Sequence, residues 1–247
     1  MEGKTPYLTS NSSGVTSQAT SQSLTSSYPE SQAPSTSGSS AVKKFHSQPK
    51  LSFVIGGKAH LFPSIFGIYR DGSKKLFLAE HHISTPFMVI ALQSGISGEP
   101  SIVLSSPTAV MGTADIHSYT SKTDIVVGST STFLQSTWGL SPTWPFTYTF
   151  DDGRQEKFEW KKSSGDAVAG LGGRSKGHKL VRVSNGEVVA AWTQPGGTSL
   201  DKLAKIGLLD SARSYGWGER WEVTVVVSAI ALVERQRAAA NNAISAA

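Results

Sequence analysis

The residues from Trp221 to Arg235 (WEVTVVVSAIALVER) form a run that is apolar on every side and carries a charge near each end. A helix that spans a bilayer needs about 20 apolar residues, and the run between Glu222 and Glu234 has about half that number. The run is therefore too short to cross a membrane. Because an apolar segment without a polar face must be enclosed by protein, the preceding chain is expected to build a wall around it.

Helix and strand compete for this run, since valine and isoleucine favour strands and periodicity does not separate a buried helix from a buried strand. Two features favour a helix. Glu219 and Glu222 lie where a helix N-terminus attracts anions, and Arg235 and Arg237 lie where a C-terminus attracts cations. The run also continues into three alanines, which are the best helix formers. We predict a helix over about residues 219–237, with a length of about 28 Å at 1.5 Å per residue.

Composition divides the chain into a tail and one globular domain. Serine and threonine make up about 40 per cent of residues 1–48, and a segment so poor in apolar residues is expected to be disordered. Residues 49–247 are enough for one sizeable core. The start of the chain has no basic and apolar pattern of a secretory signal, and cysteine is absent. We therefore expect an intracellular protein, cytoplasmic or peripheral to a membrane, without disulfides or thiolate metal sites.

The domain reads as many short strands separated by turn residues. Three hairpins are predicted, over residues 65–80, 146–160 and 180–192, each with a glycine in its turn. Further strands are expected at residues 51–54, 88–92, 102–104, 114–119 and 124–127. Many short strands indicate a sandwich or a barrel. Because a sheet that surrounds a wholly apolar helix is better closed than open, we predict a mainly β protein: a closed antiparallel barrel around the C-terminal helix.

Three segments carry a resemblance to a known family: Phe158-Glu159-Trp160-Lys161-Lys162, Lys179-Leu180-Val181-Arg182, and Gly218 to Glu222 with the helix that follows. Over about residues 146–237 the chain resembles the Tubby C-terminal-like superfamily, which includes LURP-one-related proteins and phospholipid scramblases. The resemblance implies a barrel around a central hydrophobic helix. It also implies a connection to lipids, since members include phosphoinositide-binding transcription regulators, lipid-handling membrane proteins and plant defence proteins. Fold alone does not assign function among them.

Several patterns suggest catalytic or metal chemistry but have simpler interpretations. The glycine-rich residues 170–179 match neither nucleotide-loop template, because Ser175 and His178 stand where glycine and lysine are required. They are interpreted as a flexible hairpin tip. His81 and His82 have no third ligand at a recognisable spacing, and Asp151-Asp152-Gly153 is typical of a turn. Asp115 and His117 could join a serine in a triad, but only geometry identifies one. We predict no catalytic residue, metal or cofactor.

Five of the six tryptophans can be sorted by their positions. Trp160, Trp192 and Trp221 lie in predicted strands or at the helix start and are assigned to the core. Trp138 and Trp144 lie in a loop between strands. Packing over a barrel end is favoured for those two, and insertion into a membrane interface is the alternative.

Positive charge is concentrated in one segment. Between Gly153 and Arg182 there are eight lysines or arginines against three acidic residues. A solvated basic face on neighbouring hairpins and a site for an anionic partner such as a lipid headgroup both fit this excess. The predicted headgroup-binding residues are Lys161, Lys162, Arg174, Lys176, Lys179 and Arg182.

The sequence favours a non-enzymatic lipid-headgroup-binding or membrane-peripheral module. The alternative is an intracellular protein-interaction or regulatory module whose disordered tail is phosphorylated or recruits protein partners. An integral scramblase is disfavoured by the short helix and by the absence of a cysteine-rich palmitoylation segment and an acidic calcium-type motif. Nucleic acid is not an expected partner, because the basic residues follow no recognisable binding module.

Overall fold

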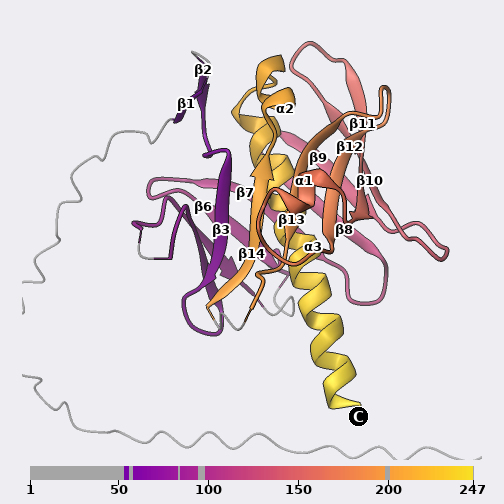
Figure 1. The fold of residues 1–247 in the computed structure, drawn as a ribbon. Coiled ribbons are helices and arrows are strands. Elements are labelled where there is room, and N and C mark those ends of the chain that lie inside the picture. The colour runs from indigo at the N-terminus through magenta and orange to yellow at the C-terminus, as the bar shows by residue number, and fades with distance from the viewer. Residues whose placement is uncertain (1–52, 56–57, 83, 94–97, 198–200, 247) are drawn as a thin grey trace, which may run out of the picture. The chain divides into compact units, whose positions relative to one another are not determined.

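The computed structural model of the chain describes residues 53–55, 58–82, 84–93, 98–197 and 201–246. Within these ranges, twelve antiparallel strands form one sheet that curls around a long C-terminal helix (Figure 1). The tail predicted over residues 1–48 lies outside the described residues. The mainly β class and the C-terminal helix predicted from the sequence are confirmed.

The strands β3 to β14 belong to this sheet, and β1 and β2 form a separate pair. Their bounds are β1 Phe53–Ile55, β2 Lys58–His60, β3 Ile65–Arg70, β4 Lys75–Ala79, β5 Met88–Leu92, β6 Ile102–Ser105, β7 Val110–Ile116, β8 Lys122–Val127, β9 Thr130–Gln135, β10 Trp144–Thr149, β11 Gln155–Ser163, β12 Gly177–Arg182, β13 Val188–Thr193 and β14 Lys202–Leu208. The helices in the described part are α1 Asp166–Ala169, α2 Asp210–Tyr215 and α3 Glu219–Ser245.

The sheet is a nearly closed barrel. Its strand order is β10-β11-β12-β13-β14-β3-β4-β5-β6-β7-β8-β9, so β10 and β9 are the two edges. These edges approach each other, and the Thr132 hydroxyl on β9 donates a 2.7 Å hydrogen bond to the Thr147 carbonyl on β10. Near closure covers edge strands that would otherwise expose unpaired backbone groups.

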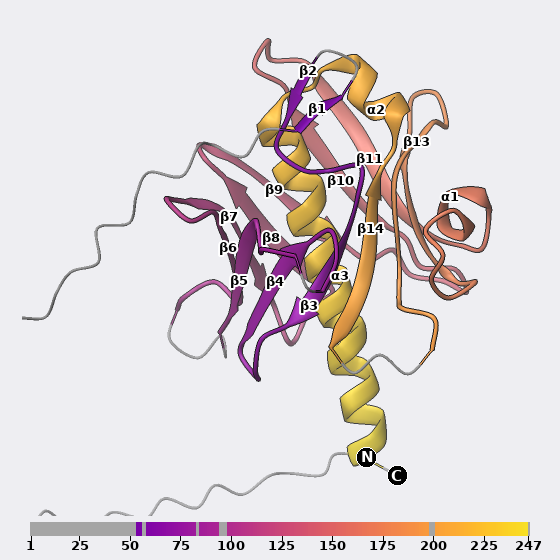
Figure 2. The ribbon, with the colours of Figure 1, turned by 60° about the vertical axis from the view of Figure 1, so that its left-hand side comes forward.

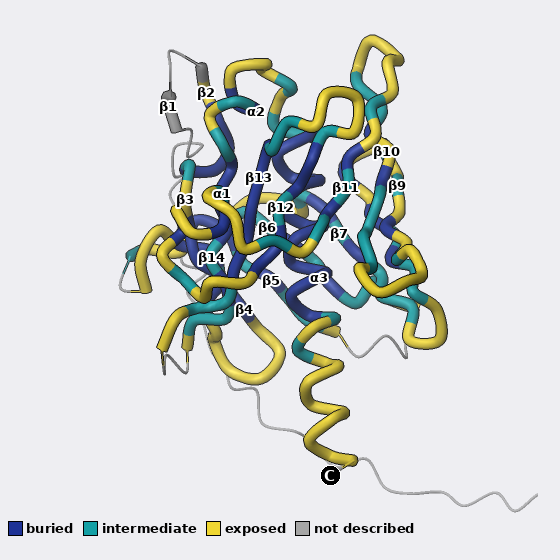
Figure 3. Tube along the Cα trace, turned by 45° about the vertical axis from the view of Figure 1, so that its right-hand side comes forward, coloured by how far each residue is buried: buried dark blue, intermediate teal, exposed yellow. Residues whose placement is uncertain are grey.

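Helix α3 occupies the inside of this barrel (Figure 2). All residues from Trp221 to Glu234 are buried, on every face of the helix, whereas residues 238–246 are exposed (Figure 3). The helix begins at Glu219, as predicted, and ends at Ser245, which is eight residues beyond the predicted end at Arg237. The three alanines after Arg237 continue the helix without a core to bury them, because alanine has the highest helix propensity.

The barrel therefore has an entry end, where α3 begins, and an exit end, where α3 leaves it. At the entry end, Arg220 of α3 forms an ion pair with Asp151 in the turn between β10 and β11. Successive strands are antiparallel, so their connections alternate between the two ends. The connections from β7 to β8, from β9 to β10 and from β11 to β12 consequently lie at the exit end.

The core consists of the helix and the inward side chains of the strands. Trp160, Trp192 and Trp221 are each at most 1% exposed, so their prediction as core residues is confirmed. The indole Nε1 of Trp160 donates a 2.9 Å hydrogen bond to the Ser228 hydroxyl of α3, which ties the helix to β11. Elsewhere in the wall, Gly112 of β7 allows close approach of the helix, because a Cβ there would lie 3.1 Å from a methyl group of Val223.

The three predicted hairpins are confirmed as β3-β4, β10-β11 and β12-β13. The turn prediction for Asp151 and Asp152 is also confirmed, with the following Gly153 at φ 82°. The strand predicted at residues 114–119 is displaced, since β7 ends at Ile116. Residues 51–52 of another predicted strand lie outside the described residues.

Candidate ligand-binding cavity

Three of the six predicted headgroup-binding residues line one cavity of about 710 Å³ at the exit end. They are Lys162 at the end of β11, and Arg174 and Lys176 in the connection that leads to β12. Gln236, where α3 leaves the barrel, also contributes to its wall. No Asp or Glu is among the described residues that line it, and none of the three cations has an ion pair in the described part of the chain.

The other three predicted residues lie elsewhere, and strand register explains why. Trp160 on β11 faces inward, so Lys161 faces outward, where its Nζ lies 2.8 Å from a carboxylate oxygen of Glu159. Lys179 is the register partner of Lys161 on β12 and shares that outer face. Neither residue lines the cavity.

Arg182 is the register partner of Phe158, at the opposite end of β12 from the cavity. Its guanidinium donates to Glu156 at 2.7 Å, and this hydrogen bond raises the pKa of Arg182. The same group lies over the ring of Tyr215 at 5.3 Å and over that of Trp217 at 5.5 Å. Arg182 is thus a packed, paired residue near the entry end.

His178 is the residue in the cavity that the sequence analysis did not identify. As the register partner of Lys162, it points inward from β12. Its ring stacks on Trp192 at a centroid distance of 4.5 Å and meets the edge of Trp144 at 5.4 Å. The side chain is 6% exposed, yet within the described residues neither ring nitrogen has a hydrogen-bond partner, and the same holds for Trp192 Nε1.

Buried polar groups are almost always hydrogen-bonded, so the unpartnered nitrogens of these two adjacent side chains can bond to a polar molecule in the cavity, whether water or a ligand. Trp192 and His178 both line the cavity. The arrangement combines an aromatic floor, a buried imidazole and three cations. It can accept a compact anion with further groups that hydrogen-bond.

The titration of His178 should be visible in the stability of the protein. Burial, reinforced by the positive charge of Lys162, lowers the pKa of His178 from 6.5 to about 4. The unfolded chain therefore binds a proton at this residue at a higher pH than the folded chain does. Folding stability must fall as the pH falls from 6.5 to about 4, because protonation in this window favours the unfolded state.

We expect the free energy of unfolding to lose about 3 kcal/mol over this window through His178 alone. His178→Phe keeps an aromatic ring against Trp192 but does not titrate. The measurement is urea unfolding of both proteins at a series of pH values. The stability of the original protein relative to His178→Phe should fall by about this amount between pH 6.5 and about 4. Curves that stay parallel would show that His178 is already charged or solvated in the folded protein.

The connection between β11 and β12 holds Arg174 and Lys176 in place. The backbone N–H of Arg174 donates to the Gln194 carbonyl at 2.8 Å, and the Thr193 hydroxyl donates to the Arg174 carbonyl at 2.9 Å. Gly173 is required by this approach, because a Cβ there would lie 2.3 Å from Thr193 Cγ2. The glycine-rich segment is thus packed against β13, whereas the sequence analysis interpreted it as a flexible hairpin tip.

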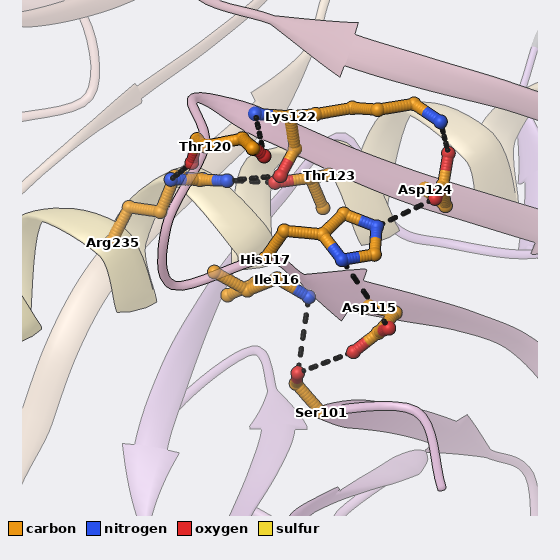
Figure 4. A network of polar contacts seen from close by, with 9 residues as sticks. All are labelled: Ser101, Asp115, Ile116, His117, Thr120, Lys122, Thr123, Asp124 and Arg235. Atoms are coloured by element: carbon orange, nitrogen blue, oxygen red, sulfur yellow. Dashed lines mark hydrogen bonds and ion pairs between the residues drawn. The ribbon is translucent and has the colours of Figure 1, made fainter. Parts of the chain in front are cut away.

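A second polar cluster contains Asp115 and His117, which the sequence allowed as members of a catalytic triad (Figure 4). The Ser101 hydroxyl donates to Asp115 Oδ1 at 2.8 Å, while His117 Nε2 lies 2.7 Å from Asp124 Oδ2. His117 Nδ1 lies 3.9 Å from Asp115 Oδ2. Within the described residues the serine is bonded to a carboxylate and not to the imidazole, so His117 is not placed as the general base of a triad on Ser101.

This cluster has a structural role. Its neighbours in the β7-β8 turn bind the end of the buried helix: Arg235 Nε donates to the Thr123 hydroxyl at 2.8 Å, and Arg235 also donates to the Lys122 carbonyl (Figure 4). Hydrogen bonds from Lys122 and His117 lower the pKa of Asp124. The network fixes the turn against α3 at the exit end.

The entry end contains a buried ionic group that the sequence did not reveal as a site. Glu222 of α3 is 4% exposed and lies 2.5 Å from His60 Nδ1. Its other oxygen accepts hydrogen bonds from the backbone N–H groups of Leu61, at 2.9 Å, and Phe62. Arg213 of α2 is also buried, and it donates to the Phe62 carbonyl. Glu222 therefore joins the helix to the chain that enters β3.

The two tryptophans assigned to a loop, Trp138 and Trp144, differ in burial. Trp144 is half-buried against the core and contacts His178. Trp138 is 99% exposed, so the expectation that both would pack over the barrel is wrong for Trp138. Loop position alone did not separate them, because only Trp144 belongs to a strand, β10.

His81 and His82 are both exposed, and His82 lies 3.8 Å from a carboxylate oxygen of Asp201. Across the described ranges, no three His, Cys, Asp or Glu side chains are grouped closely enough to hold a metal ion. In the same part of the chain, none of the helices has the length and apolar character needed to cross a bilayer.

Three comparisons with known proteins returned no match: a scan against family models, a search of curated proteins and a search of solved structures. The function must therefore be argued from the cavity itself.

Proposed function

We propose that this protein is a non-enzymatic, membrane-peripheral module that binds an anionic lipid headgroup in the exit-end cavity. The observation that carries the proposal is the buried imidazole of His178, unpartnered among the described residues, in a cavity whose described lining includes Lys162, Arg174 and Lys176 and no carboxylate. A phosphate group matches this chemistry, since it is anionic and offers several acceptor oxygens.

Further support comes from the resemblance to the Tubby C-terminal-like superfamily, whose architecture is a barrel around a hydrophobic helix and whose members include phosphoinositide-binding proteins. We propose membership of that superfamily. A catalytic role is not proposed, because the Ser101 hydroxyl is bonded to Asp115 and not to His117. The protein-interaction alternative depends on the N-terminal tail, which lies outside the described residues.

The proposal predicts that the protein binds vesicles that contain phosphatidylserine or phosphoinositide, and that Lys162→Glu with Arg174→Glu weakens this binding. Each cation near an anionic surface contributes about 1 kcal/mol. Loss of two cations should lower the partition coefficient by roughly thirty-fold. The loss should be larger in this variant, because glutamate reverses the charge at both positions. Co-sedimentation with vesicles at several salt concentrations measures the effect.

A matched control makes the same change in net charge away from the cavity. Arg154→Glu with Lys157→Glu alters two exposed cations near the other end of β11, away from the cavity. This control should bind vesicles almost as the original protein does. An equal loss in both double variants would indicate general surface attraction, and no binding to anionic vesicles even at low salt would refute the proposal.

A further inference from the structure

The loop between β9 and β10 exposes two large apolar side chains. Trp138 and Leu140 are both fully exposed. The sequence from Ser136 to Pro145 carries no charge. Exposed apolar groups that gather on one loop mark a surface that contacts another phase or molecule.

The loop is held in this projecting form by its base. Thr137 N–H donates to the Thr143 carbonyl at 2.8 Å, and Thr143 N–H donates to the Thr137 hydroxyl at 2.9 Å. The Thr143 hydroxyl in turn donates to Glu159 on β11. Because the base is closed, the exposure of Trp138 and Leu140 does not come from an unattached chain.

Strand register places this loop beside the cavity. Trp144, which follows the loop, is the register partner of Trp160 on β11, two residues from Lys162. The ring of Trp144 also meets the edge of His178, whose nitrogens are unpartnered in the described structure. The apolar loop and the cationic cavity therefore share the exit end of the barrel.

A neighbouring loop adds a second exposed aromatic ring. Tyr119, in the turn between β7 and β8, is 100% exposed. This turn adjoins the first loop, since Ser136 N–H donates to the Ser121 carbonyl at 3.4 Å. Tryptophan and tyrosine favour the boundary between headgroups and acyl chains, where an apolar ring and a polar edge are both accommodated.

We propose that residues 137–143 insert into the interfacial layer of an anionic bilayer while the cavity holds a headgroup of the same membrane. The inference rests on the proposed function and adds the loop as the anchor. Charge complementarity selects a bilayer as the occupant, because uncharged apolar groups lie next to three cations that have no ion pair among the described residues. Helix α3 extends about 15 Å past Glu234, so the membrane must approach obliquely, over the β9-β10 side.

The test compares Trp138→Ser with Leu140→Ser against the control Val110→Ser with Val183→Ser, which alters exposed apolar side chains at the entry end. Two probes are used: vesicles of phosphatidylcholine with phosphatidylserine and phosphatidylinositol bisphosphate, and free inositol trisphosphate. We expect the loop variant to lose at least about ten-fold in vesicle binding, since each apolar side chain that leaves water adds about this factor. Its binding of inositol trisphosphate and its melting temperature should not change.

Quenching of tryptophan fluorescence by lipids with brominated acyl chains gives a direct readout. The quenching should be present in the original protein and should decrease in Trp138→Ser alone. Unchanged vesicle binding in the loop variant, or an equal loss in the control, would overturn the inference about the loop. Binding of inositol trisphosphate would in that case still support the cavity. Loop-dependent vesicle binding without inositol trisphosphate binding would support the anchor and count against the cavity, and binding of neither probe would refute both.

Discussion

Ile230→Asp is expected to abolish the folded protein. Ile230 is 0% exposed in the middle of α3, where the barrel surrounds the helix on all sides. A carboxylate at this point would be buried without a partner and would cost several kcal/mol. The free energy of unfolding of a domain is about 5–15 kcal/mol, so one such charge removes most or all of it. Yield of soluble protein and thermal unfolding followed by circular dichroism measure the loss.

The same helix offers a control. Ala239→Asp introduces the same side chain on the exposed part of α3 and should leave the melting temperature within a few degrees of the original value. If Ile230→Asp instead gave soluble protein with a cooperative transition like that of Ala239→Asp, α3 would not be the post around which the barrel folds.

Much of the architecture could be predicted because the apolar run of α3 admits few solutions. An all-round apolar segment too short for a bilayer requires a closed wall, and hairpins with glycine turns supply one. The end of α3 was harder to place, since residues after Arg237 are exposed and only intrinsic propensity extends the helix. Strand β9 was missed for a related reason: in TSTFLQ only Leu134 is buried, so alternation is weak.

The cavity was only partly accessible from the sequence. Charge counting found Lys162, Arg174 and Lys176 but added three residues that the sheet separates from them. Alternation along β11 could have distinguished Lys162 from Lys161, because Phe158 and Trp160 fix which face is inward. His178 carried no such signal on its own strand. The position of His178 in the cavity depends on the pairing of β12 with β11 and β13. The register between strands cannot be predicted from the sequence of one strand.

The charges at the ends of the apolar run also differ from their sequence interpretation. Glu222 was expected to interact with the helix N-terminus, yet it is buried and accepts a hydrogen bond from Leu61, a residue distant in the sequence. Glu234, at the other end, is buried as well and accepts a hydrogen bond from Arg237 at 2.6 Å. Glu222 therefore has partners that only the folded barrel brings together, whereas the partner of Glu234 lies one turn further along the same helix.

Glu222→Gln is expected to lower the free energy of unfolding by about 3–5 kcal/mol, because removing one member of a buried ionic group leaves the others uncompensated. The amide keeps the shape of the side chain but replaces one acceptor oxygen with a donor that faces His60 or the backbone N–H groups of Leu61 and Phe62. It also removes the negative charge near Arg213. Burial lowers the pKa of Arg213, and the charges of Glu222 and Asp210 oppose that shift.

A double-mutant cycle separates this ionic effect from simple loss of packing. Arg213→Met retains most of the side-chain volume and removes the buried cation. If Glu222 compensates Arg213, the variant with both changes should be less destabilised than the sum of the single variants, with a coupling of about 1–3 kcal/mol. Glu99→Gln, at an exposed position, serves as the control and should unfold like the original protein. Urea unfolding measures the free energy of unfolding of every variant. Two results would show that the helix is not anchored through this carboxylate: additive losses in the two single variants, or a Glu222→Gln variant whose stability lies within about 0.5 kcal/mol of the original.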